Sequence, residues 1–82
     1  MIKMELKDTV QLMISDDYKD RFIAEYRQLV IRFEKLRKMI ENWDSLNFLP
    51  ECPKAAYNMQ LKAMGEYIAV LEVRAVIEHI DI

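Results

Sequence analysis

The chain has 82 residues, a net charge of −2 and one cysteine, so it is long enough for a single domain, residues 1–82. A core of this size supplies only about 3–5 kcal/mol unless a disulfide, a metal or association adds to it. The lone Cys52 excludes an internal disulfide, and the acidic balance argues against a protein that coats DNA. With no run of roughly 18 apolar residues and no export signal, the sequence predicts a cytoplasmic protein without a membrane contact.

Helical spacing of apolar residues runs through most of the chain. The pattern predicts three helices, at about residues 4–14, 17–43 and 53–79. The segment from Ser15 to Asp17 separates the first two helices and caps the second, because its side-chain oxygens accept hydrogen bonds from free amides at a helix start. Pro53 suits the first turn of the third helix. The connection before it is expected to fold back onto the helix ends, because it contains the apolar residues Leu46, Phe48 and Leu49.

Two heptad seams predict that the second and third helices pack side by side. The first seam runs through Phe22, Tyr26, Leu29, Phe33, Leu36, Ile40 and Trp43. The other runs through Tyr57, Leu61, Met64, Ile68, Leu71 and Ala75. From residue 55 to residue 80, 17 of 26 residues are apolar, which is typical of a helix buried all round. The predicted fold is therefore all-α: a short N-terminal helix, then a long antiparallel helical hairpin, assembling as an oligomer because one partner helix covers only one side.

Residues for catalysis are sparse. Cys52 and His79 are the only cysteine and histidine, and they sit at opposite ends of the third helix, about 40 Å apart at 1.5 Å per residue. They would meet only in a contact between copies. The chain has no Gly-rich phosphate loop, since the single glycine, Gly65, lies within a helix. The sequence therefore predicts a protein that is not an enzyme and that uses no cofactor or metal.

The second helix is basic within an acidic chain. From residue 19 to residue 38 there are seven Lys or Arg residues against three acids. One interpretation is a solvated face with helix-stabilising ion pairs such as Glu34–Lys38. The other is a patch that holds a phosphorylated ligand, because a planar guanidinium donates two hydrogen bonds to a phosphate at once. Arg21 and Arg32 are then the candidate phosphate-binding residues.

A polar edge lies beside the seam of the third helix, where Gln60, Tyr67 and Arg74 follow one another at intervals of seven residues. The equivalent edge of the second helix carries Glu25 and Arg32. Polar residues that flank a heptad core often pair across helices and select the partner. The alternative is a ligand pocket between copies. In such a pocket Tyr67 or Tyr26 stacks on a base and Gln60 hydrogen-bonds its edge, while Arg74 binds a phosphate.

Three segments in order resemble a family of short phage proteins: SDDYKDRFIAEYRQLVIRFEKLRKM (15–39), LNFLPECP (46–53) and MGEYIAVLEVRAVIEHI (64–80). That family was first catalogued in a crAss-like gut phage and is common in phages and prophages of Firmicutes. Its members often have Gly-Ile near the end, where this chain has His79 and Ile80, which argues against a ligand role for His79. The resemblance implies a phage accessory protein in the cytoplasm of a bacterial host. Small helical oligomers of that kind include anti-defence sponges, an analogy of size, class and setting.

Two functions compete on this basis. The first is a non-enzymatic protein that sequesters a nucleotide-derived immune signal, a cyclic nucleotide or an ADP-ribose derivative, to inhibit bacterial anti-phage defence. The second is a protein–protein interaction module that binds and inhibits a host or phage protein through the apolar third helix. Binding to duplex nucleic acid is not expected, because the basic patch is short and the net field is repulsive.

Overall fold

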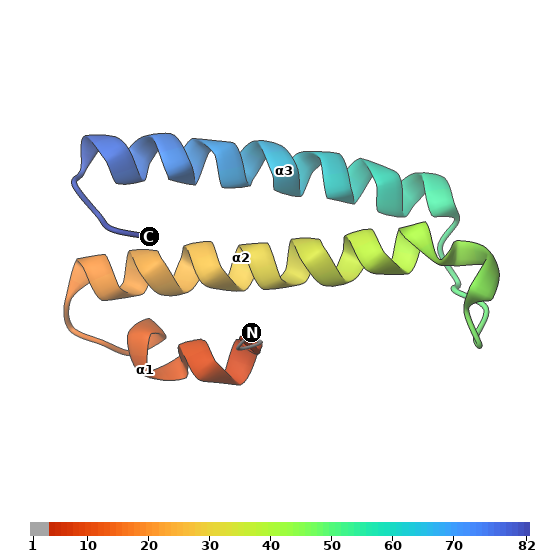
Figure 1. Cartoon of the computed structure of the whole chain (residues 1–82), viewed down its shortest axis with the longest axis horizontal. Helices are drawn as coiled ribbons and strands as arrows, with labels where there is room; N and C mark the ends of the chain where they lie inside the picture. Colours follow the sequence, from red (N-terminus) through yellow and green to blue (C-terminus); the bar gives the residue numbers. More distant parts are fainter. Residues whose placement is uncertain (1–3) are drawn as a thin grey trace.

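The computed structural model describes residues 4–82. The elements in chain order are η1 (Leu6–Thr9), α1 (Val10–Met13), α2 (Tyr18–Glu41), η2 (Trp43–Ser45) and α3 (Lys54–Ile77), where η marks a 3₁₀ turn. No strand occurs among residues 4–82, which confirms the all-α class. The helices form three layers, with α2 in the middle, α3 antiparallel along one side, and η1 with α1 along the other (Figure 1).

The start of α2 is fixed by side-chain caps, as the sequence predicted. The carboxylate of Asp17 accepts a hydrogen bond of 2.9 Å from the amide of Lys19. The hydroxyl of Ser15 donates to the carboxylate of Asp20 at 2.8 Å. The Asp17 carboxylate satisfies an amide that has no partner within the helix, and the carboxylates of Asp17 and Asp20 both oppose the positive end of the helix dipole. The helix begins one residue later than predicted and ends two residues earlier.

The N-terminal segment differs from the single helix predicted over residues 4–14. It is a 3₁₀ turn followed by one α-helical turn. The hydroxyl of Thr9, which is fully buried, donates to the carbonyl of Leu6 at 2.7 Å and accepts from the side chain of Gln28 at 2.8 Å. The local bond favours the tight turn over a continuous helix. The bond from Gln28 fastens this layer to α2, so tertiary contact decides the local geometry.

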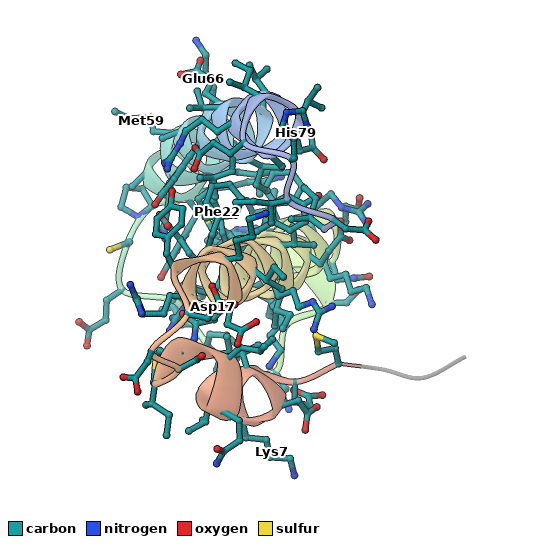
Figure 2. All side chains as sticks on the ribbon, turned by 90° about the vertical axis from the view of Figure 1, so that its left-hand side faces the viewer. Lys7, Asp17, Phe22, Met59, Glu66 and His79 are labelled. Atoms are coloured by element: carbon teal, nitrogen blue, oxygen red, sulfur yellow. The ribbon has the colours of Figure 1, made fainter. Side chains whose placement is uncertain are left out.

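The core lies between α2 and α3 and follows the predicted seams. Its buried residues are Phe22, Leu29, Leu71, Ala75 and Ile80. Phe22 lies between the two helices in the end-on view (Figure 2). At the far end of the pair, the rings of Trp43 and Tyr57 pack with centroids 5.9 Å apart. The connecting segment corrects one expectation, because Phe48 and Leu49 are exposed instead of folded onto the helix ends.

The end of α3 is closed by a Schellman motif. The amide of Ile80 donates to the carbonyl of Ala75 at 2.9 Å, and the amide of His79 donates to that of Val76 at 3.4 Å. His79 has a φ of 58°, in the left-handed region that glycine adopts without strain. The motif turns Ile80 back into the core, where it is buried against the seam. The helix therefore ends two residues before the predicted 79, and position 79 has a backbone role.

We expect His79→Gly to stabilise the chain by about 1 kcal/mol, because glycine removes the steric cost of a left-handed residue. For a chain of this size the gain raises Tm by about 4–8 °C. Thermal unfolding followed by circular dichroism measures the shift. His79→Ala is the control, since it removes the imidazole but keeps the backbone strain, and it should not raise Tm. An equal gain from both variants would contradict the backbone explanation.

The outer face of α3, turned away from α2, carries exposed apolar side chains. They are Met59, Val70, Val73, Val76 and Ile77, with exposed fractions from 56% to 77%. Met59 and Glu66 both point away from α2 in Figure 2. Within residues 4–82, no helix combines the length and the apolar character needed to cross a membrane. The structure thus leaves uncovered the surface that made the sequence predict association, and assembly as an oligomer stays a prediction.

Candidate ligand-binding flank

One side of the α2–α3 pair carries polar residues in matching heptad positions. We call this side the polar flank and define it by Tyr18, Glu25 and Arg32 on α2 and Arg74, Tyr67 and Gln60 on α3. Each helix advances by seven residues from one member to the next, and the helices are antiparallel. The six residues therefore face each other as three pairs, which we call rungs: Tyr18 with Arg74, Glu25 with Tyr67, and Arg32 with Gln60. The first rung lies at the open end of the helix pair, opposite the connecting segment, and the third lies near its middle.

The first rung is a closed network of three side chains. Arg74 Nε donates to the carboxylate of Glu78 at 3.0 Å, and Arg74 Nη2 donates to the hydroxyl of Tyr18 at 2.7 Å. Tyr18 in turn donates to Glu78 at 2.7 Å. The guanidinium also lies 5.0 Å from the ring centroid of Phe22, within range of a cation–π contact. The three side chains therefore cover the end of the core at Phe22, and their polar groups are hydrogen-bonded to one another.

The network also shifts the ionisation of its members. The hydrogen bond from Tyr18, and then the one from Arg74, lower the pKa of Glu78 from its ordinary 4.5, and burial acts in the opposite direction. The bond to the Glu78 carboxylate and burial raise the pKa of Tyr18. The bond to Glu78 is also the main reason that the pKa of Arg74 is raised. At neutral pH the rung therefore holds one anion, one cation and a neutral phenol.

The second rung is also closed, and a similar pair lies on the other side of the helices. The hydroxyl of Tyr67 donates to the carboxylate of Glu25. On the opposite flank, Tyr26 donates to Glu72 at 2.7 Å, and that bond, with burial, raises the pKa of Tyr26. Each pair joins α2 to α3 beside the apolar seam. They match the simpler interpretation of the polar edge, in which flanking residues pair across helices and fix the register.

The third rung is open. Arg32 and Gln60 are both exposed. Within residues 4–82, neither side chain makes a hydrogen bond or an ion pair. Tyr67, one heptad from Gln60 on α3, is 44% exposed although its hydroxyl donates to Glu25. A guanidinium, an amide and an aromatic face are therefore available together on one stretch of surface.

The other residues predicted to bind a ligand, Arg21, Arg74 and Tyr26, lie outside the third rung. Arg21 is eleven residues from Arg32, which is three helical turns, so both lie on the same side of α2, about 16 Å apart along its axis. The guanidinium of Arg21 donates to the carbonyl of Ser15 at 2.8 Å. Tyr26 is on the opposite flank. The structure thus places Arg32, Gln60 and Tyr67 on one flank, places Arg21 and Arg74 toward the open end of the helix pair, and puts Tyr26 on the other flank.

A cavity that sequence analysis did not find lies between the N-terminal segment and α2. It measures about 230 Å³ and is lined by Met4, Val30, Ile31, Glu34, Lys35 and Lys38. Lys35 is held by an ion pair of 3.1 Å to Glu5. The two lysines belong to the basic run of α2. Met4 belongs to the N-terminal segment, and the spacing of its apolar residues does not predict where that segment packs on α2. Among residues 4–82, no group of three or more His, Cys, Asp or Glu residues could hold a metal ion.

The layered helices and the polar flank define a small all-helical protein with a guanidinium, an amide and a tyrosine exposed on one side. The Sequestin family model matches residues 16–77. This match spans more than half of the chain and both long helices, so the chain belongs to the Sequestin family. The name of that family is consistent with a sequestering or binding role. No curated protein and no solved structure matches the chain.

We expect Arg74→Ala to lower Tm measurably, because it removes two hydrogen bonds of the first rung and the cation over Phe22. Arg32→Ala is the matched control on the same flank and should leave Tm nearly unchanged, since exposed residues without partners contribute little to stability. Thermal unfolding of both variants makes the comparison. Equal losses of Tm would contradict the distinction between closed and open rungs.

Glu78→Gln should lower stability at neutral pH and lose its effect in acid. A pKa that is lower in the folded state adds stability above the unfolded-state pKa, and that stability disappears as pH falls through the folded-state value. For Glu78 this loss occurs below about pH 4.5, the ordinary value from which its pKa is lowered. Denaturant unfolding of both proteins from pH 7 to pH 3 measures the difference. A difference that stays constant over that range would exclude a role for the Glu78 charge.

Proposed function

We propose that this protein is a phage-encoded, non-enzymatic binding protein that sequesters a nucleotide-derived immune signal in the cytoplasm of a bacterial host. The signal is a cyclic nucleotide or an ADP-ribose derivative, and its removal inhibits anti-phage defence. Membership of the Sequestin family supports a sequestering role. The observation that carries the proposal is the open third rung, where Arg32 and Gln60 lie exposed beside the accessible ring of Tyr67.

Each of these three groups suits one part of a nucleotide. The guanidinium of Arg32 donates paired hydrogen bonds to a phosphate. The ring of Tyr67 stacks on the base, a contact worth about 1–3 kcal/mol per base. The amide of Gln60 donates to and accepts from the edge of the base. Because Glu25 already holds the Tyr67 hydroxyl, the ring is oriented before the ligand arrives, which reduces the entropy lost on binding.

Arg21 and Arg74 serve a second phosphate near the open end of the helix pair. Arg74 is engaged by Glu78 and Tyr18, so an anion there exchanges one set of hydrogen bonds for another. Tyr26 lies on the opposite flank, so it could stack only on a ligand that binds to that flank, and it takes no part in the site at the open rung. Sequestration requires affinity and many sites, and it requires no turnover. Self-association would multiply the sites in each assembly.

A second candidate function is supported by the outer face of α3. Val76 and Ile77 on this face are 77% and 69% exposed. Apolar patches of this kind mark protein–protein contact sites. In this alternative the protein binds and inhibits a host or phage protein through α3, and no small ligand is involved.

Isothermal titration calorimetry against a panel of cyclic di- and trinucleotides and ADP-ribose derivatives tests the proposal. We expect one class to bind the unmodified chain, and we expect Arg32→Ala and Gln60→Ala each to weaken that binding by at least about tenfold, equivalent to about 1.4 kcal/mol. Arg27→Ala is the control. It removes the same side chain from the same helix, about 140° around the axis from Arg32, and should bind normally.

Two results would count against the proposal. Absence of binding heat for every ligand of the panel would favour the alternative, in which the protein binds another protein through α3. Binding that is equally weak in Arg27→Ala and Arg32→Ala would mean that general positive charge, and not the open rung, attracts the ligand. In that case the affinity should also fall steeply with salt.

A further inference from the structure

The outer face of α3 has a charge pattern as well as an apolar one. Its charged residues are Lys62 and Glu66, one helical turn apart, and both are exposed. Glu66 points directly away from α2 in Figure 2. A second α3 laid parallel and in register would place Lys62 against Lys62 and Glu66 against Glu66, two repulsions at the centre of an apolar surface. An antiparallel α3 avoids both.

Two antiparallel copies of α3, related by a two-fold axis that crosses the helices at the level of residue 64, bring each charged residue opposite one of the other sign. Lys62 of one copy then lies across from Glu66 of the second copy, and the symmetry repeats the pair on the other side of the axis. Opposite charges at such positions stabilise and orient helix pairs. The face thus complements itself in charge in one orientation.

The same register places small side chains of one copy opposite larger side chains of the other. Counting outward from position 64, Ala55 falls opposite Val73 of the second copy, and Met59 falls opposite Ala69. The N-terminal half of the face is rich in alanine, whereas its C-terminal half carries valines and an isoleucine. Small residues opposite large ones allow two helices to approach closely and interlock. A parallel pair in register would instead set Val73 against Val73 and leave the alanines opposite one another.

We propose that the outer face of α3 binds a second copy of this chain, antiparallel and two-fold symmetric, with Lys62 and Glu66 paired across the interface. In this arrangement α3 contacts α2 of its own chain on one face and α3 of the second copy on the outer face. The interface requires no ligand, so it goes beyond the proposed function, and its failure would leave that function untouched.

Sedimentation velocity of the full chain at micromolar concentration tests the assembly. We expect a species of twice the chain mass of 9.8 kDa. Val73→Asp should convert it to monomer, because the charge would be buried at the interface without a partner. Val73 is 59% exposed in the single chain, so the variant should keep its helical circular dichroism. Ile14→Asp is the control, since Ile14 is similarly exposed but lies beside α1.

A mixing experiment tests the pairing of these charges between copies. A chain with Lys62→Glu and a chain with Glu66→Lys should each be monomeric, because like charges then face each other across the axis. Mixed together, they should form a one-to-one dimer, which native mass spectrometry detects when one chain is labelled with ¹⁵N. Ion pairs within a single helix cannot produce this rescue. The double variant K62E/E66K should dimerise by itself.

Three outcomes would overturn the proposal. The first is a monomer of the unmodified chain at every concentration reached. The second is a dimer that survives Val73→Asp but dissociates in Ile14→Asp, which would place the contact on the N-terminal layer. The third is a mixture of the two single-charge variants that stays monomeric, which would exclude the antiparallel pairing of Lys62 with Glu66.

Discussion

The central position of α2 is the constraint on which the rest of the structure depends. Its seam residues Phe22 and Leu29 are buried against α3, while Gln28, on the other side, is fastened to the buried hydroxyl of Thr9. One helix therefore supplies the contact surface for both other layers. Because α2 is covered on two sides, its basic residues can reach solvent only along its flanks. The position of the polar flank, and of Arg32 within it, follows from this packing.

Much of this arrangement could be predicted from the sequence, because heptad spacing is a property of residue types alone. The seams through Phe22 and Leu71 locate the core, and the acidic cap at Asp17 locates the start of α2. The hydrogen bonds of the flank could not be predicted in the same way. Spacing places Arg74 and Tyr67 on one edge, but it does not say which residue of α2 lies opposite. That depends on the register, which the packing of the whole seam determines.

The failures have physical causes too. The connecting segment was expected to bury its apolar residues, yet Phe48 and Leu49 are exposed, because hydrophobicity alone does not specify a surface to cover. The first helix was expected to be continuous, but Thr9 bonds to the local carbonyl and to α2 instead. His79 illustrates the opposite case. The resemblance to a family with glycine at this place argued against a ligand role, and the left-handed backbone of the Schellman motif gives a physical reason for glycine there.

The polar flank and the outer face occupy different sides of α3, and this separation links the two proposals. Gln60 and Lys62 are two residues apart, so they project about 160° from each other around the helix axis. A second copy on the outer face would therefore leave Gln60, Tyr67 and Arg32 open to solvent. A two-fold assembly would then carry two equivalent flanks that point away from the interface. For a protein that acts by holding ligands in proportion to its own abundance, an interface that consumes no binding surface preserves one site for every chain.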